Sequence, residues 1–570
     1  MILRHLTVAA RFGTQFLLGI GLSMLPAIVT PPPVEAAERI YVTFGPANLF
    51  LGIDTLETFA EEGIVTAELE NYLRLAGASS PEDQAAFRAS LTERFDFDLT
   101  GVNRFFATPT GDAILERIGI IISTRQGQNG KDALREALVQ LSQNQTAGFT
   151  VLDFLRSLPE DLQLNADRAR QGAIYGEILI NGTQAVVEKM AVLAAEQGQR
   201  ETSIDFASLP DLRKPGTSGF TALKWQLTDP KRDRTFDVYV HQPQRWREGK
   251  TPVVIISHGL SSSPQDFSNR AEQLASFGYV VAAPQHIGSD TQQRQAMLAG
   301  KSQELYKLDE FIDRPLDISY VIDELERRNA AEFAGRLDLD NVGVLGHSFG
   351  GYTALALAGA TFDFENLDRV CNQETRGLNL SLILQCRALD LPRRAYDFRD
   401  PRVKAVMAMN PVNSAVFGTT GLGQVKIPVL IGAGSKDPAA PAAIEQLQAF
   451  VWIDSREKYM AMAVGQAHVD FDNLDAGTTA LIESFPQLIL PQQSLIDQYA
   501  AALNLAFSEV YLTGNQSYRP YLQSAYGNFI SREPNPLYFV EASADLPLSE
   551  LFNQLKPDHV RSIYPPGRQP

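Results

Sequence analysis

Apolar positions recur at helical spacing through the first third of the chain. Between about residues 54 and 199 the breaks fall at prolines, and Leu134, Leu138 and Leu141 repeat at intervals of four and three. Such a stripe buries one face of a helix in a core. We therefore predict an all-α domain over residues 37–208. Because no cluster of catalytic or metal-ligating residue types stands out in it, its role stays open between a scaffold, a cap and a partner-binding surface.

The pattern changes after residues 209–219, a polar stretch with proline and glycine that is typical of a linker. Continuous apolar runs then alternate with helical segments, as expected of strands buried on both faces. The sequence therefore predicts an α/β fold, a mostly parallel sheet covered by helices, over residues 220–490. A C-terminal extension at residues 491–570 is expected to pack on this domain. The predicted strands include residues 235–240, 252–257, 279–283, 342–345, 403–409 and 429–432.

Two insertions, at residues 361–401 and 412–424, interrupt the alternation of strands and helices. Inserted apolar segments near the catalytic edge of such a sheet form lids or pocket walls. We expect Phe417, in the shorter insertion, to contact substrate. The longer insertion holds the two cysteines of the chain, Cys371 and Cys386. A disulfide and a pair of free buried thiols are the alternatives, and we expect the disulfide.

The first 36 residues have the pattern of a secretory signal. Arg4 and Arg11 lie near the start of the chain, and an apolar run follows at residues 16–29. Ala36 lies where small residues predict a cleavage site. A transmembrane anchor is the alternative, but a comfortable span needs about twenty apolar residues. We therefore predict a cleaved signal, no stable membrane span, and export to the periplasm or the external medium.

The formal net charge is −17, and no long run of lysine or arginine occurs in the chain. This balance argues against nucleic acid and against an anionic membrane surface as partners. A small neutral or apolar ligand fits the composition better. The oligomeric state does not follow from the sequence.

The most specific motif is the hexapeptide GHSFGG at residues 346–351, placed between an apolar strand-like run and a helix-forming run. A nucleophilic serine stands clear of its backbone on a tight strand-to-helix turn, which needs small residues on both sides. Gly346 and Gly350 occupy those positions, so Ser348 is the candidate nucleophile. A glycine-rich nucleotide turn is the alternative, but the spacing does not fit G-x-G-x-x-G.

Serine needs a base, and the chain has seven histidines. In the order that this motif implies, serine is followed by the acid and then by histidine. His468 and His559 are placed late enough in the chain. His468 follows an apolar run at residues 459–464, whereas His559 lies in a polar tail. His468 is therefore the candidate base.

The acid is expected in the loop after the preceding strand, and Asp437 closely follows the run at residues 429–432. Its carboxylate would orient the imidazole and stabilise the imidazolium as it forms. A structural aspartate in a turn before proline is the alternative reading of Asp437. Asp470 and Asp472 are rival acids, although both are close to His468 in the sequence.

An oxyanion hole needs two backbone N–H groups, one from the residue after the nucleophile and one from the loop after an earlier strand. Phe349 and Leu260 hold these positions. We expect His258 and Gly259, which precede Leu260, to line the substrate pocket. His286, at another strand end, is a further candidate for the pocket, with a purely structural loop histidine as the alternative.

These residues resemble those of α/β-hydrolases that include platelet-activating-factor acetylhydrolases and dienelactone-hydrolase-like proteins. The resemblance covers about residues 235–468 and implies the α/β-hydrolase fold and short-acyl or lipid ester substrates. Ser348 stands where a dienelactone hydrolase usually has cysteine, which favours ordinary ester hydrolysis over lactone chemistry. The N-terminal half resembles an uncharacterised domain that precedes such hydrolases in exported bacterial, chiefly cyanobacterial, proteins.

We therefore expect a serine hydrolase that cleaves carboxylic esters through an acyl-enzyme, with no metal and no organic cofactor. A small-molecule or lipid-like ester is the expected partner. The same triad would also serve a peptidase or amidase, or a depolymerase of polyesters or lipids acting at an interface. An alternative of another class is a binding or assembly protein with a vestigial hydrolase domain.

Overall fold

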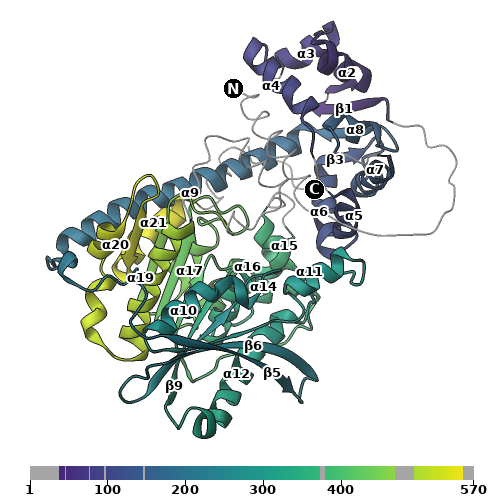
Figure 1. The fold of residues 1–570 in the computed structure, drawn as a ribbon. Coiled ribbons are helices and arrows are strands. Elements are labelled where there is room, and N and C mark those ends of the chain that lie inside the picture. Colours follow the sequence, from purple (N-terminus) through teal and green to yellow (C-terminus); the bar gives the residue numbers. More distant parts are fainter. Residues whose placement is uncertain are drawn as a thin grey trace.

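The computed structural model describes residues 37–44, 47–75, 78–95, 98–144, 148–372, 379–468 and 493–555. The predicted signal at residues 1–36 lies outside these ranges, as do the alternative base His559 and the rival acids Asp470 and Asp472. The described chain forms a large sheet covered by helices and a smaller amino-terminal unit beside it (Figure 1).

Within the described residues, one nine-stranded sheet has the order β13-β12-β11-β10-β9-β7-β8-β6-β5. The neighbours from β12 to β8 run parallel, whereas β13, β6 and β5 are antiparallel to their neighbours. The predicted α/β fold class is confirmed. The strands are β5 (Phe220–Asp229), β6 (Arg234–Pro243), β7 (Thr251–Ser257), β8 (Val280–Pro284), β9 (Leu337–His347), β10 (Val403–Met409), β11 (Val429–Gly434), β12 (Lys458–Ala463) and β13 (Leu537–Glu541).

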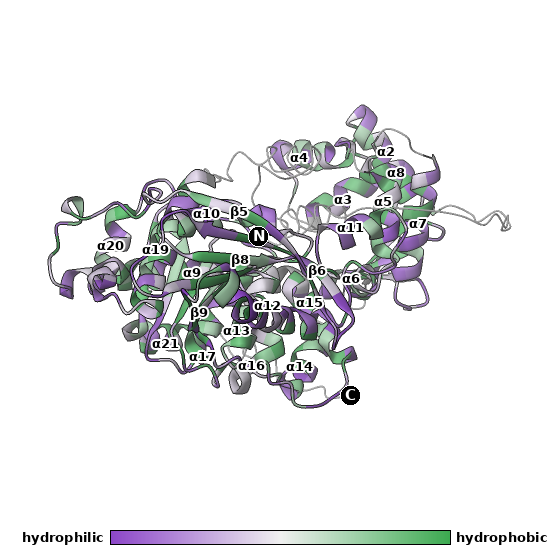
Figure 2. Ribbon diagram, turned by 60° about the horizontal axis from the view of Figure 1, so that its bottom comes forward, coloured by the Kyte–Doolittle hydropathy of each residue, from purple (hydrophilic) through white to green (hydrophobic). Residues whose placement is uncertain are grey.

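Helices bury both faces of this sheet. Along β7, Val253 and Ile255 belong to the core on one face, whereas Val254 and Ile256 belong to the core on the other. This alternation is the two-residue period of a strand with no solvent-exposed side. Central strands such as β8 are accordingly hydrophobic throughout (Figure 2).

The two helical layers differ in where they come from along the chain. One face is covered by α10 (Ser268–Ser276), α19 (Gln493–Leu512) and α20 (Ser524–Ile530). The other face is covered by α12 (Glu310–Glu332), α13 (Phe349–Leu357), α17 (Gln446–Trp452) and α21 (Asp545–Leu555). The C-terminal extension therefore packs on both faces and also adds β13 to the edge of the sheet.

The amino-terminal unit is mostly helical, but it is not all-α, so that prediction is wrong. A four-stranded sheet in the order β2-β1-β4-β3 lies among its helices. Strands β3 and β4 have three and four residues, too few to show a two-residue period in the sequence. The elements are β1 (Arg39–Phe44), β2 (Ala47–Gly52), α2 (Ile53–Glu62), α3 (Ala67–Leu75), α4 (Pro81–Thr92), α5 (Leu99–Phe106), α6 (Pro109–Ile121), β3 (Ile122–Thr124), α7 (Lys131–Asn144), α8 (Val151–Arg156) and β4 (Leu162–Asn165).

A 35-residue helix, α9 (Ala166–Arg200), joins the two units (Figure 1). Its start is capped by Asn165, whose side chain accepts from the Arg168 N–H. Val186, Met190 and Ala194, spaced at i, i+4 and i+8, are buried in the core of the large sheet. The second half of α9 thus belongs with that core, although the predicted linker at residues 209–219 follows it in the sequence.

The two insertions form helices, and α15 of the longer insertion packs against α6 of the amino-terminal unit. They contain α14 (Phe364–Cys371), α15 (Leu380–Cys386) and α16 (Ser414–Leu422), while residues 373–378 lie outside the described ranges. Cys371 and Cys386 form a disulfide, as we expected. Ile383 of α15 and Met297 of α11 (Thr291–Leu298) are buried in the core of the amino-terminal unit.

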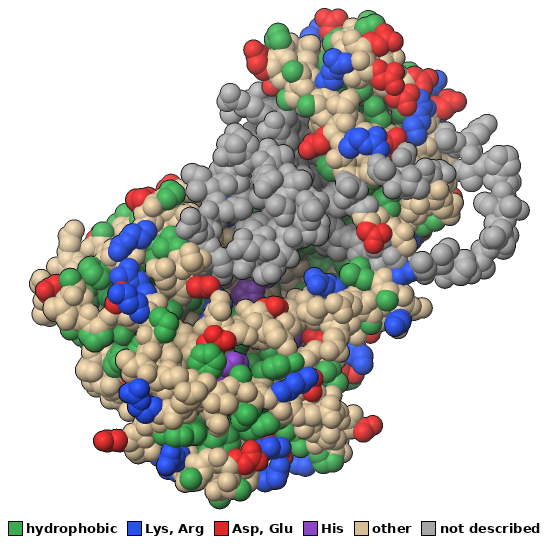
Figure 3. Space-filling model, in the orientation of Figure 1, with side chains coloured by type: hydrophobic (Ala, Val, Ile, Leu, Met, Phe, Trp, Pro, Cys, Tyr) green, Lys and Arg blue, Asp and Glu red, His purple; other side chains and the backbone are tan. Residues whose placement is uncertain are grey.

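Charged side chains of both signs are interspersed on the face shown in Figure 3. Among the residues that the structure describes, no helix combines the length and the apolar composition needed to cross a membrane.

Candidate active site

The turn between β9 and α13 carries Ser348. This serine has φ 57° and ψ −116°, a left-handed conformation that non-glycine residues adopt at a cost. The turn is so tight that a Cβ added to Gly346 would lie 1.9 Å from the Gly350 carbonyl oxygen. A Cβ on Gly350 would lie 1.9 Å from the Ser257 carbonyl oxygen. Both glycines are therefore required sterically, as the motif predicts.

The structure brings His468 and Asp437 to this serine. His468 Nε2 is 2.8 Å from Ser348 Oγ, and His468 Nδ1 is 2.7 Å from Asp437 Oδ2. Since a carboxylate only accepts, Nδ1 carries the proton and Nε2 accepts from the serine hydroxyl. This is the arrangement in which the imidazole is ready to take the serine proton.

Asp437 is held by donors on both of its oxygens. Oδ1 accepts from the Ala439 and Ala440 N–H groups at 2.9 and 2.7 Å, and Oδ2 also accepts from Asn410 Nδ2 at 2.6 Å. The Asp437 side chain is fully buried, so these bonds replace the water that its carboxylate loses. Its orientation toward His468 is therefore fixed before any substrate arrives.

The two predicted oxyanion donors belong to backbone segments next to Ser348. Phe349 is the first residue of α13, and the first intrahelical bond there runs from Tyr352 N–H to the Ser348 carbonyl at 3.1 Å. The earlier N–H groups of a helix have no intrahelical acceptor. Leu260 follows Gly259, where an added Cβ would lie 3.4 Å from Ser348 Cβ. Both backbone segments are thus in contact with the nucleophile.

Two of the predicted pocket residues lie behind the site. His258 and His286 are fully buried, and burial lowers the pKa of each well below its ordinary value. His286 Nε2 is 2.9 Å from Ser257 Oγ, and its Nδ1 is 3.0 Å from Asp317 Oδ2. The prediction that His258 and His286 contact substrate is therefore wrong, because neither imidazole is exposed. Sequence placed both at strand ends without showing which way they point.

Phe417 needs the same correction. It is fully buried and stacks on Tyr352 at 5.0 Å between ring centroids, with 4° between the ring planes. Tyr352 lies on α13, so this pair packs α16 against the helix that carries Phe349. Phe417 is part of the core beneath the insertions, where it has no access to a substrate.

Sequence reasoning missed two residues that position the triad. His347 donates from Nε2 to the His468 carbonyl oxygen at 2.9 Å, which holds the loop that carries the base. Asn410 follows β10 and donates to Asp437. A polar residue directly after a buried strand was the available signal for Asn410. Nothing local in the sequence indicates the contact of His347, because its partner is 121 residues away.

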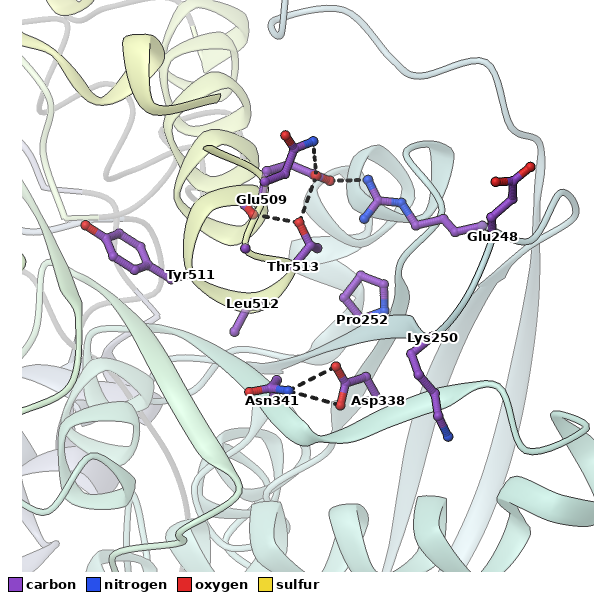
Figure 4. Close-up of a pocket in the computed structure, with 12 residues that line it drawn as sticks. Glu248, Lys250, Pro252, Asp338, Asn341, Glu509, Tyr511, Leu512 and Thr513 are labelled. Carbon is purple, nitrogen blue, oxygen red and sulfur yellow. Dashed lines mark hydrogen bonds and ion pairs between the residues drawn. The ribbon is translucent and has the colours of Figure 1, made fainter. Parts of the chain in front are cut away.

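A polar cavity of about 870 Å³ lies at the opposite end of the strands (Figure 4). It includes Pro252 and Asp338, near the amino ends of β7 and β9, whereas Ser348 follows the carboxyl end of β9. Its buried carboxylate, Glu509, accepts from Tyr279 at 2.9 Å and from Arg247. Because ligands of open α/β sheets bind at the carboxyl ends of the strands, the triad marks the candidate active site.

Comparisons with known proteins agree with the α/β fold of the large sheet. A family model described as "Alpha/beta hydrolase of unknown function (DUF1400)" matches residues 36–165. A model described as "Chlorophyllase" matches residues 227–517, just over half of the chain. Platelet-activating factor acetylhydrolase of Cavia porcellus is 26% identical over a region that covers 20% of this chain. That region spans 35% of the length of the relative.

Proposed function

The chain belongs to the chlorophyllase family of α/β-hydrolases, and from this premise we propose that it hydrolyses carboxylic esters through an acyl-enzyme on Ser348. The observation that carries the proposal is the hydrogen-bonded series Ser348, His468 and Asp437 at 2.8 and 2.7 Å. A binding protein with a vestigial hydrolase domain has no need of all three groups in register. Short-acyl or lipid-like esters are the proposed substrates.

The geometry supports a two-step acyl transfer. Ser348 Oγ attacks the ester carbonyl carbon while its proton moves to His468 Nε2, and the oxyanion accepts from the N–H groups of Phe349 and Leu260. The alcohol leaves with the proton from His468, and the acyl group stays on Ser348. Water then gives a proton to His468 and attacks the acyl carbon. His468 returns this proton to Ser348 Oγ as the bond to the acyl group breaks, which releases the acid and restores the serine. Asp437 remains a carboxylate throughout.

The substrate class rests on two supports. The relatives bear the names of ester hydrolases, chlorophyllase and platelet-activating factor acetylhydrolase. The net charge of −17 and the apolar insertions favour a neutral or lipophilic ester over an anionic polymer. We also propose export to the periplasm or the medium, which agrees with the disulfide of Cys371 and Cys386.

The test is hydrolysis of p-nitrophenyl esters from acetate to palmitate by the full chain, with Ser348→Ala as the variant and Ser517→Ala, at an exposed position, as the serine control. We expect wild-type turnover with a preferred chain length, and a loss of more than about a thousand-fold in Ser348→Ala. The Ser517 hydroxyl donates only to the nearby Asn515 side chain, so Ser517→Ala should keep the activity of the wild type. Equal activity of Ser348→Ala and wild type would refute the serine mechanism.

A second substrate series separates the neighbouring functions. Matched p-nitroanilides of the preferred acyl group test for an amidase, and a rate that rises above the solubility limit of the ester indicates an interfacial depolymerase. No turnover of any ester or amide by folded protein would leave the binding or assembly role.

A further inference from the structure

The peptide between Gly259 and Leu260 carries one of the two proposed oxyanion donors, and a buried arginine holds its carbonyl. Arg314 lies in the first turns of α12 and is fully buried. Its Nη1 donates to the His258 carbonyl oxygen at 2.5 Å, and its Nη2 donates to the Gly259 carbonyl oxygen at 3.2 Å. The two arms of one guanidinium thus fix two successive carbonyls of the loop.

His258 adds a second donor on the same carbonyl. Its Nε2 accepts from the His286 N–H at 3.1 Å, so the proton of the neutral ring is on Nδ1. Nδ1 donates to the Gly259 carbonyl oxygen at 2.8 Å. The Gly259 carbonyl therefore accepts from both a neutral and a charged donor, and it has little freedom to rotate.

Fixing this carbonyl also fixes the Leu260 N–H. In a planar trans peptide the C=O and the N–H point in opposite directions. The Leu260 N–H therefore leaves the peptide on the side opposite Arg314. A cation on the carbonyl side also polarises the peptide, which increases the partial positive charge on its N–H.

The charge of Arg314 is retained in its buried site. Burial lowers its pKa to about 10, and the nearby Glu310 carboxylate, 3.5 Å from Nε, opposes the shift. The guanidinium is therefore protonated at neutral pH. Its Nε donates to Ser289 Oγ at 2.9 Å, so every arm of the fork is engaged.

Arg314 also contacts the residue that bears the other oxyanion donor. Its guanidinium carbon lies 4.5 Å from the centroid of the Phe349 ring, a cation–π distance. We propose that Arg314 is a positioning residue of the oxyanion hole, which aligns and polarises the Leu260 N–H and braces Phe349. This inference rests on the proposed ester hydrolysis, and it assigns a role to a residue that touches no substrate.

The experiment compares Arg314→Lys with Arg234→Lys in the full chain. Arg234 is a matched control, because it is also a buried arginine paired with Glu310, at 2.8 Å, but its hydrogen bonds go to acidic side chains. For each protein we would measure kcat and KM on the preferred p-nitrophenyl ester. The inhibition constant of a trifluoromethyl ketone with the same acyl chain reports binding of a tetrahedral oxyanion, and thermal unfolding reports the fold.

We expect Arg314→Lys to lower kcat by about ten- to a hundred-fold with KM within about two-fold, since a misaligned donor acts mainly on the transition state. The ketone should bind more weakly by the same factor, and Arg234→Lys should keep both values within about two-fold. An equal loss in both variants, or a kcat loss with unchanged ketone binding, would overturn the role of Arg314. Inactivity of the wild-type protein on every ester would instead overturn the proposed function.

If Arg314→Lys does not fold, a second pair of variants tests the control of the Leu260 peptide from its carbonyl side. His258→Asn retains a donor near the Nδ1 position, whereas His258→Leu removes it. We expect the asparagine variant to retain most of the ketone affinity and the leucine variant to lose about ten-fold or more. Equal affinity in these two variants would contradict control of the Leu260 peptide from its carbonyl side.

Discussion

The carboxylate of Asp437 has two oxygens with different tasks, and this gives a sharp test of the proposed acid. Oδ1 accepts two backbone N–H groups, which would keep the oxygen of an asparagine at the same place. The amide NH₂ of Asp437→Asn would then face His468 Nδ1 and force the proton onto Nε2. We expect kcat to fall by about 10⁴-fold with a small change in KM, measured on the preferred ester.

Asp454→Asn is the control for this substitution. Its carboxylate pairs with Lys426 on the surface and lies outside the site, so kcat should stay within about two-fold of wild type. A loss of less than about ten-fold in Asp437→Asn would show that Asp437 is not the acid. Asp470 and Asp472 would then be the residues to replace.

Buried imidazoles, those of His258 and His286 among them, make the stability of the fold depend on pH. His258 and His286 have pKa values lowered well below 6.5, by burial and by the positive charge of Arg314. Below about pH 6.5 the unfolded chain binds these protons and the folded chain does not. The free energy of unfolding should therefore fall with decreasing pH, by up to about 3 kcal/mol per pH unit for the two groups.

Urea unfolding at pH 7.5, 6.5 and 5.5 measures this slope. His258→Asn removes one of the two groups, so the slope below pH 6.5 should decrease by up to about 1.4 kcal/mol per pH unit. An unchanged slope in the variant would mean that His258 takes up its proton in the folded state as well.

At the residue scale, the sequence was enough to predict which side chains carry the proposed chemistry. It was not enough to predict contacts between residues that are distant in the chain. Ser348 and His468 follow from a turn that needs glycines and from the small number of histidines. His286 and Phe417 were misplaced because a strand end or an insertion does not reveal the direction of a side chain. Arg314 lies 55 residues from the carbonyl of Gly259 that it holds, and no local pattern marks such a pair.

At the scale of elements, burial decides which strands the sequence reveals. The central strands such as β7 and β8 are buried throughout and appear as continuous apolar runs. Edge strand β5 alternates between exposed and buried positions and half of its residues are polar, and β13 has five residues in an irregular tail. Both escaped prediction because an edge strand has only one neighbour to satisfy and carries less apolar surface.

The same reasoning explains the small sheet of the amino-terminal unit. Strand β1 pairs with β2 through a short connection and with β4, which lies about 120 residues later in the chain. Pairing over such a distance adds no periodicity to either segment. The helices around it were predictable, as the start of α4 shows. Ser80 precedes Pro81, the first residue of the helix, and its side chain accepts from the Asp83 N–H.

At the scale of the whole molecule, the two units share their cores. Met190 of α9 is buried against the large sheet, while Met297 and Ile383 of the hydrolase part are buried in the amino-terminal core. Arg104 of α5 also donates to the Leu298 carbonyl oxygen. Unfolding of either unit would therefore expose apolar surface on the other.

This exchange of buried residues predicts that the chain unfolds as one unit. Calorimetry of the full chain should show a single transition. Met297→Ala should lower the free energy of unfolding by about 2 to 5 kcal/mol, and the transition should remain single. Val192→Ala, at a position of α9 that is 52% exposed, is the control and should change it by less than about 0.5 kcal/mol. Two resolved transitions, with only the first moved by Met297→Ala, would instead mean that the amino-terminal unit folds independently. A single transition would mean that this unit holds α11 and α15 in place beside the catalytic sheet, so that changes in it reach the site through stability.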